Sequence, residues 1–178
     1  MKLYTHKSLN YGFVILCPDH AVNLLESTAN SIKSRYPGIS YICATDDTAN
    51  AQDLKEMKQI CPTFKGRGTF SSLINTGMKH TPADWTFLVC AGVTVRAKLD
   101  LRFSYFINSE KDICFPIAEN KYNFVDGTLN GIFVHKNTFK EIGDWKEFDN
   151  LEWVKTLWAL SAIDKGCKFK AIAGCKIC

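Results

Sequence analysis

Short, largely apolar runs alternate with amphipathic helical patterns along this chain, and the alternation constrains the fold more than any other feature of the sequence. The run YGFVILC at residues 11–17 is apolar without interruption and is followed by Pro18, which is typical of a strand buried on both faces of a sheet. Residues 19–36 then place apolar side chains three and four positions apart, which predicts one helical stripe that ends at Pro37-Gly38. The opening of the chain therefore predicts a strand followed by a helix.

The same alternation continues through the rest of the chain. Further strands are expected at residues 39–45, 85–90, 112–118, 130–135 and 167–173. Further helices are expected at 49–60, 70–78, 99–107 and 144–166, with a short helix ending at Gly143 and a loop at 63–68. Units of this length predict an α/β fold with a mostly parallel, doubly wound sheet. Since 178 residues suit one domain with a sizeable core and are too few for two, we expect a single domain over residues 1–178.

Composition and charge narrow the class of protein. With 46% hydrophobic and 22% charged residues, the chain has the composition of an ordinary globular protein. The net charge of +4 is spread along the sequence, and the basic stretches KGRG and KGCKFK are short. This pattern favours an anionic partner such as a nucleotide phosphate and argues against a nucleic-acid surface. The N-terminal apolar run is too short for a signal peptide or a transmembrane segment, which predicts a cytoplasmic protein.

The eight cysteines indicate a reducing compartment. Cys17, Cys43, Cys90 and Cys114 lie inside apolar runs, where a free thiol behaves as a small buried hydrophobe. The C-terminal CKIC, preceded by Cys167, invites a zinc or redox interpretation. A four-ligand zinc site would need another ligand from elsewhere, and a terminal C-x-x-C does not open a helix as redox motifs do. We therefore interpret it as an incidental tail.

Two short segments are candidates for ligand contact, because ligands of doubly wound sheets bind at the carboxyl ends of the strands. Asp46 and Asp47 directly follow the second predicted strand, where a carboxylate accepts hydrogen bonds from a ribose diol or a base N–H. The alternative is that they cap the next helix. Lys65 and Arg67 of KGRG, flanked by glycines, suit a diphosphate. The alternative here is a flexible basic loop without a ligand.

Taken in order, these segments resemble the GT-A fold of the family 2 glycosyltransferases, the nucleotide-diphospho-sugar transferases. FVILCPDH is similar to the family's first strand and turn, YICATDD to its acidic pair, GRGTFSSLINTGM to its helix with Asn-x-Gly, and NGIFVHKNTFKEIGDW to its acceptor-side segment. The resemblance covers roughly residues 12–170. It implies a three-layer α/β/α sandwich and a nucleotide-diphospho-sugar as substrate, with Asp46, Asp47 and Asn75 on the nucleotide.

The sequence departs from the family's pattern in three places. The metal motif Asp-x-Asp would fall at Cys90, Ala91 and Gly92, which offer no carboxylate to the hard cations Mg²⁺ and Mn²⁺. The Arg before Asn-x-Gly is replaced by Ile74, and the Glu-Asp pair that supplies a general base is at best Glu152-Trp153. We therefore expect no bound divalent metal and no other cofactor.

Acidic residues gather before the late helix, at Asp144, Asp149 and Glu152. An inverting sugar transfer needs one carboxylate to take the proton of the acceptor hydroxyl. Acids also collect at helix N-termini because of the helix dipole alone. Among the three, Glu152 is our first candidate for the catalytic base and Asp149 the second.

Three functional hypotheses follow. In the first, a glycosyltransferase-like enzyme passes the sugar to an unknown hydroxyl acceptor without a metal, and Lys65, Arg67 and Arg96 offset the charge of the leaving diphosphate. In the second, the lost metal ligands mark a catalytically silent relative that keeps the fold as a binding or assembly module. In the third, a different nucleotide-binding α/β protein has converged on this pattern.

The histidines and tryptophans allow a few further predictions. His20 is expected to reach the ligand cleft if the first turn lines it, and His135 is expected to be structural. No two of the four histidines lie at metal-ligand spacing. Trp145, Trp153 and Trp158 are expected to fill the core beneath the late helix.

Overall fold

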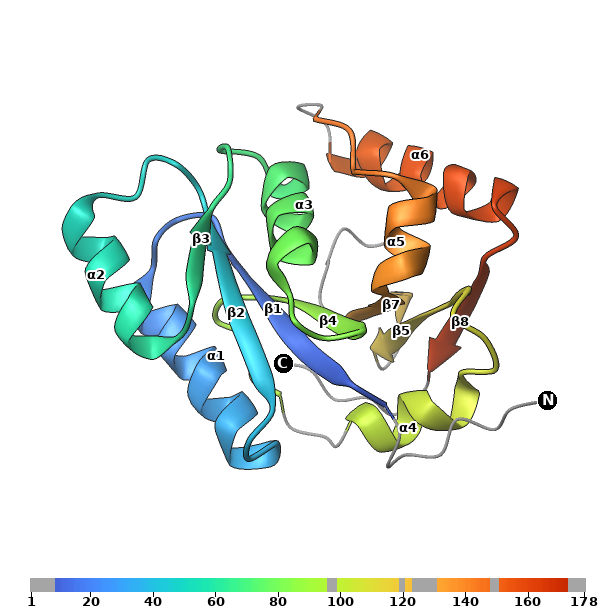
Figure 1. The fold of residues 1–178 in the computed structure, drawn as a ribbon, viewed down its shortest axis with the longest axis horizontal. Coiled ribbons are helices and arrows are strands. Elements are labelled where there is room, and N and C mark those ends of the chain that lie inside the picture. The colour runs from blue at the N-terminus through green and yellow to red at the C-terminus, as the bar shows by residue number, and fades with distance from the viewer. Residues whose placement is uncertain (1–8, 96–98, 119–120, 123–130, 148–150, 173–178) are drawn as a thin grey trace.

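A mixed sheet lies between two layers of helices in the computed structural model, which describes residues 9–95, 99–118, 121–122, 131–147 and 151–172 (Figure 1). The strands are β1 (Tyr11–Cys17), β2 (Ser40–Thr45), β3 (Thr63–Lys65), β4 (Trp85–Cys90), β5 (Asp112–Ala118), β6 (Lys121–Tyr122), β7 (Ile132–His135) and β8 (Lys168–Ile172). The helices are α1 (Val22–Arg35), α2 (Ala51–Ile60), α3 (Phe70–His80), α4 (Leu99–Phe106), α5 (Lys136–Ile142) and α6 (Leu151–Asp164). None of these helices is long and apolar enough to span a bilayer.

The strands follow the order β3-β2-β1-β4-β7-β5-β6, and β8 pairs with β5. β1 to β4 are parallel to one another, and β8 is parallel to β5, which confirms the mostly parallel sheet. The exceptions are β7, which runs antiparallel between β4 and β5, and β6, which is antiparallel to β5. Because the chain first builds outward from β1 to β3 and then adds β4 on the other side of β1, the strand order reverses between β1 and β4. Such a reversal is where doubly wound sheets bind ligands.

The three layers follow from the two faces of the central strand β1. Successive side chains of a strand point to opposite faces, so Phe13 and Ile15 join one buried cluster and Val14 and Leu16 join the other. The first cluster contains buried residues of α1, α2 and α4, and the second contains those of α3, α5 and α6. In Figure 1, α3, α5 and α6 accordingly lie above the sheet, while α1 and α4 lie below it. The three-layer α/β/α architecture is thereby confirmed.

Three local expectations were wrong. Residues 63–65 form a short strand, β3, because they extend the sheet by pairing in parallel with residues 43–45 of β2. The late helix begins at Leu151 rather than near residue 144, because the backbone of Trp145 is held by the side chain of Asn75. The first helix begins at Val22 rather than at residue 19, since the backbone at His20 has a φ of 50°, outside the helical range.

Close contact between α3 and β1 explains the glycine of the Asn-x-Gly motif. Gly77 faces Val14 across the interface, and a β-carbon at this position would lie 2.2 Å from Val14 Cγ1. A glycine here lets the helix approach the central strand more closely than any other residue would. The conspicuous glycine of this motif therefore has a packing role.

Candidate functional site

The carboxyl ends of the parallel strands β1, β2 and β4 meet at one edge of the sheet. Their ends are tied together locally: Thr45 Oγ1 donates to Cys17 O at 2.8 Å, and Ala91 N donates to Leu16 O at 2.8 Å. The loop after β3 joins this edge because Gly66 N donates to Thr45 O at 2.8 Å. The turns after these strands therefore lie together at the point where the strand order reverses, and we call the polar residues of this edge the rim: His20, Asp46, Asp47, Lys65 and Arg67.

Asp46 is the best-defined polar group on this rim. Its residue is only 9% exposed, and its Oδ1 accepts hydrogen bonds from Thr48 N at 2.8 Å and Thr48 Oγ1 at 2.6 Å. His20 Nε2 lies 3.3 Å from the same oxygen. Among the described residues, no donor contacts the second carboxylate oxygen, Oδ2. This oxygen is also not among the buried atoms that lack a hydrogen-bond partner, so it is accessible from outside. The carboxylate is therefore oriented on one side and open to a ligand on the other.

Neither acid of the pair caps the following helix. The N-cap of α2 is Asn50, whose side chain accepts a hydrogen bond from Asp53 N at 2.9 Å. This excludes the alternative interpretation of Asp46 and Asp47 as the caps of α2. Asp47 is exposed, and its backbone carbonyl accepts a hydrogen bond from Lys65 Nζ at 3.0 Å. Lys65 is thus brought to the acidic pair.

His20 does reach this site, and the turn that carries it has an unusual backbone. Its φ of 50° lies in the left-handed region, which costs an L-residue roughly 1–2 kcal/mol. Its ring nitrogens Nδ1 and Nε2 lie 3.3 Å from Thr45 Oγ1 and 2.8 Å from Thr48 Oγ1. Both hydroxyls also donate within the site, Thr45 Oγ1 to Cys17 O and Thr48 Oγ1 to Asp46 Oδ1. These contacts hold His20 against Asp46.

Arg67 lies at the other end of the rim. Its Nη1 lies 3.4 Å from Glu147 Oε2, and the two side chains are 79% and 41% exposed. The backbone N of Arg67 donates to Ser72 Oγ at 2.7 Å, which anchors the loop to the first turn of α3. An exposed ion pair of this kind contributes about 0–1 kcal/mol. The guanidinium can therefore exchange Glu147 for an anionic ligand at little cost.

Asn75 uses both ends of its amide within the protein. Its Nδ2 donates to Trp145 O at 2.9 Å, and its Oδ1 accepts from Trp145 N at 2.9 Å. These two bonds tie α3 to the segment between α5 and α6. Contact between Asn75 and a nucleotide stays a prediction, but the observed role of the side chain is this tie. No local sequence pattern indicates a pair that is 70 positions apart.

The donor set at Cys90, Ala91 and Gly92 does not fit a hard divalent cation. Burial raises the pKa of the Cys90 thiol to about 11, so the thiol is protonated at neutral pH and is a poor metal ligand. Gly92 has a φ of 92°, and its N–H donates to Thr28 Oγ1 at 2.9 Å, which fixes this turn against α1. Within the described ranges, no group of three or more His, Cys, Asp or Glu side chains could hold a metal ion.

Of the three candidate catalytic acids, the structure describes the side chain of Asp144 alone. Glu152 belongs to the first turn of α6, but its side chain lies outside the described residues, as do Asp149, Arg96 and the CKIC tail. Asp144 is exposed and lines a groove beside α6. The choice between Glu152 and Asp149 as the base stays a prediction.

The tryptophan expectation was right for two residues and wrong for one. Trp145 and Trp158 are 2% and 4% exposed and pack together, with their ring centroids 5.4 Å apart. Trp153 is instead 64% exposed, because it lies outside the stripe of α6 that faces the core, which contains Val154 and Trp158. His135 is buried and accepts a hydrogen bond from Asn137 N at 3.2 Å, so it caps α5 as a structural residue.

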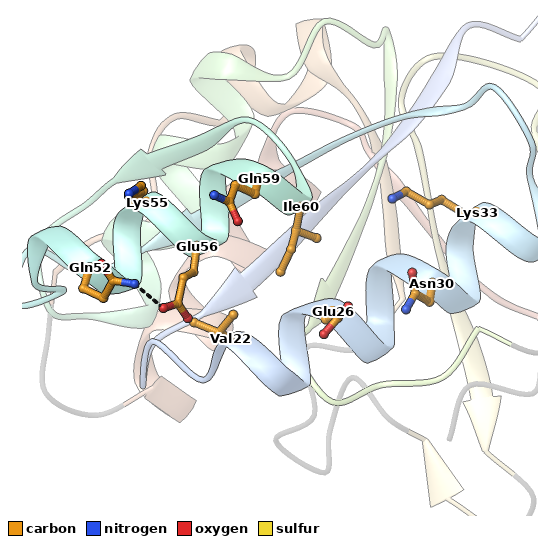
Figure 2. Close-up of a pocket in the computed structure, with 9 residues that line it drawn as sticks. All are labelled: Val22, Glu26, Asn30, Lys33, Gln52, Lys55, Glu56, Gln59 and Ile60. Carbon is orange, nitrogen blue, oxygen red and sulfur yellow. Dashed lines mark hydrogen bonds between the residues drawn. The ribbon is translucent and has the colours of Figure 1, made fainter.

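A separate groove of about 580 Å³ lies between α1 and α2 (Figure 2). Its walls are long polar side chains of both signs, including Glu26, Lys33, Lys55 and Glu56. Gln52 Nε2 donates to Glu56 Oε1 at 2.5 Å along the same helix. The groove is walled by the outward side chains of two helices and contains none of the rim residues, so we do not assign it a role in ligand binding.

Comparisons with known proteins support the fold alone. No family model matches the sequence, and no curated protein matches it. Among solved structures, the bifunctional IspDF of Campylobacter jejuni superposes with a TM-score of 0.60 at 11% sequence identity. The match covers 93% of this chain and 50% of that one, so this chain spans about half the length of the protein it resembles.

This likeness confirms the three-layer α/β fold. Nothing in it is specific to the glycosyltransferases of family 2. In all, 203 chains of solved structures match, so the fold is widely used, and one fold serves many functions.

Proposed function

We propose that this chain binds a nucleotide-diphospho-sugar at the carboxyl edge of β1, β2 and β4, and that Asp46 recognises the base or the ribose. The observation that carries the proposal is the arrangement of the Asp46 carboxylate. Thr48 and His20 hold Oδ1, and Oδ2 is left to accept a hydrogen bond from a ligand. Since ordering this carboxylate in advance reduces the entropy lost on binding, the arrangement suits a binding site.

The diphosphate would lie along the rim towards Lys65 and Arg67. Lys65 is already held beside the acidic pair, and Arg67 is exposed on a loop anchored to α3. Two cations at one end of the rim offset the charge that a leaving diphosphate develops. The protonated thiol of Cys90 is a poor metal ligand. We therefore assign to Lys65 and Arg67 the electrostatic role that a metal has in related folds.

The reaction we propose is an inverting transfer of the sugar. The oxygen of an acceptor hydroxyl forms a bond to the anomeric carbon, while the bond from that carbon to the diphosphate oxygen breaks and the diphosphate leaves with the electron pair. The hydroxyl proton passes to a carboxylate, for which Glu152 is the first candidate and Asp149 the second. A cytoplasmic location is part of the same proposal.

A catalytically silent binding module is the second candidate function. It is favoured by the thiol, methyl and hydrogen at Cys90, Ala91 and Gly92, and by the engagement of Asn75 with Trp145 rather than with a ligand. In this case the nucleotide would bind at Asp46 without being turned over, or would not bind at all.

Calorimetric titration with UDP, UDP-sugars and GDP-sugars, with and without Mn²⁺, tests the proposal. We expect binding that does not require Mn²⁺ and that weakens at least roughly tenfold in Asp46→Ala, because a hydrogen bond to a charged group contributes about 1.5–3 kcal/mol. Asp164→Ala removes an exposed carboxylate from the end of α6 and should leave the affinity unchanged. Slow release of free sugar from the bound donor would support transferase activity, and binding without release would support the silent module. Absence of binding to every nucleotide would refute the proposal.

A further inference from the structure

A groove of about 500 Å³ lies between α3, α6 and the segment that connects α5 to α6. Trp145 and Trp158 belong to its wall and are almost completely buried, while Leu157 of α6 is 38% exposed. Asp144 and Glu147 contribute exposed carboxylates. The groove therefore combines an aromatic and aliphatic surface with hydrogen-bond acceptors.

One hydrogen bond is missing in this wall. Trp145 Nε1 is a buried donor without a hydrogen-bond partner, and it is the only such side-chain atom among the described residues. The neighbouring indole shows the usual arrangement, since Trp158 Nε1 donates to Gly143 O at 3.2 Å. A buried donor left unsatisfied is destabilising, and native proteins rarely retain one. Its presence in a groove wall points to an acceptor that arrives with a ligand.

The side chains that line the groove indicate which kind of ligand it can bind. An apolar ligand would leave the indole N–H unsatisfied. A phosphate would find no excess of positive charge, because Lys146 and the Arg67 that pairs with Glu147 only balance the carboxylates of Asp144 and Glu147. A neutral hydroxylated ligand satisfies every group. Its oxygens accept from the indole, its hydroxyls donate to the carboxylates, and its C–H face packs on the apolar wall.

We propose that this groove binds a sugar unit, one oxygen of which accepts the hydrogen bond that Trp145 Nε1 leaves unmade. The N–H is covered in the free protein, so a ligand reaches it only after side chains that line the groove rearrange. Glu147 also lies 3.4 Å from Arg67, so the groove adjoins the proposed diphosphate end of the rim. The sugar's role as an acceptor rests on the proposed function, whereas its binding does not.

The test uses the indole N–H signals of the nucleotide-free protein. The chain has four tryptophans, so a ¹H–¹⁵N spectrum shows four indole peaks, and the peak lost in Trp145→Phe assigns Trp145. Glucose, galactose, mannose and N-acetylglucosamine are titrated separately into the millimolar range. We expect at least one of them to move the Trp145 indole peak downfield, as a newly formed hydrogen bond does, while the peak of the exposed Trp153 stays in place.

Two variants separate binding in the groove from a change in folding. Trp145→Phe keeps most of the ring and should weaken the affinity for that sugar roughly tenfold, the effect of losing one buried hydrogen bond. Ser161→Trp fills the groove from its rim without entering the core and should abolish binding. Trp153→Phe, outside the groove, is the matched control. The inference is overturned if no sugar moves the Trp145 peak, or if Ser161→Trp binds as tightly as the unaltered protein.

The same experiment distinguishes this inference from the proposed function. Asp46→Ala, which should weaken nucleotide binding at least roughly tenfold, should leave the sugar-dependent shift of the Trp145 peak unchanged. A sugar-dependent shift in a protein that binds no nucleotide would support the groove and refute the nucleotide site. Nucleotide binding without any sugar-dependent shift of the Trp145 peak would support the nucleotide site and refute the sugar groove.

Discussion

Gly77→Ala should destabilise the protein, although glycine to alanine normally stabilises a helix. The new β-carbon would lie 2.2 Å from Val14 Cγ1, whereas carbon atoms in contact prefer about 3.5–4.0 Å. Val14 is fully buried in the central strand, and its β-branched side chain has few alternative rotamers. Either α3 or the side chain of Val14 must therefore move by roughly 1.3 Å or more.

The expected change in the free energy of unfolding is the balance of two opposing effects. Overpacking a well-packed core costs about 1–3 kcal/mol, and alanine regains about 1 kcal/mol through its higher helix propensity. Because the clash is short and involves a stiff side chain, we expect a net loss of about 1–2 kcal/mol in the free energy of unfolding. This corresponds to a fall of about 2–8 °C in melting temperature for a chain of this size.

Urea unfolding followed by circular dichroism measures this loss. Gly68→Ala is the matched control, because a β-carbon there has no neighbour within 4 Å. It should leave the free energy of unfolding unchanged or raise it by up to about 1 kcal/mol. In the double variant Val14→Ala/Gly77→Ala the clash is absent, so its loss should be smaller than the sum of the two single losses. Wild-type or higher stability of Gly77→Ala, with an unchanged dependence on urea, would refute the close contact between α3 and β1.

Two further predictions concern the thiols and His20. Burial raises the pKa of Cys61 and of Cys90 to about 11 from a reference value of 9.0, so the folded state favours the protonated thiols. The free energy of unfolding should be unaffected by these thiols below pH 9, should fall as the pH rises from 9 towards 11, and should fall less steeply in Cys61→Ala/Cys90→Ala. An equal slope in both proteins, measured by urea unfolding, would contradict this. His20→Gly should keep the fold, because glycine accepts a φ of 50°, yet should weaken nucleotide binding by freeing Asp46. Calorimetry showing wild-type affinity would rule out a positioning role for His20.

Most of the secondary structure could be predicted from the sequence. Strand 11–17 is apolar throughout, and strand 85–90 is apolar apart from Thr86, because helices cover both faces of the sheet. This burial is visible in the sequence as an apolar run. The buried stripe of α1 likewise follows from its helical spacing. The position of Asp46 at the carboxyl edge of the sheet was predictable as well, since it directly follows a parallel strand.

The short and antiparallel elements were harder to predict. β3 has three residues, too few for a periodic pattern, and becomes a strand only because β2 offers an unpaired edge. The antiparallel direction of β7 is equally invisible, because a buried strand has the same composition in either direction.

The sequence by itself determined the α/β class, the order of its units and the rim of charged residues at the carboxyl edge. Tertiary structure alone decided what those residues do. It brought His20 to Asp46, directed Asn75 to the backbone of Trp145 and Arg67 to Glu147, and left one buried indole N–H without an acceptor. The physical reason is that periodicity reports local burial, whereas a hydrogen bond between residues 70 positions apart depends on how the layers pack.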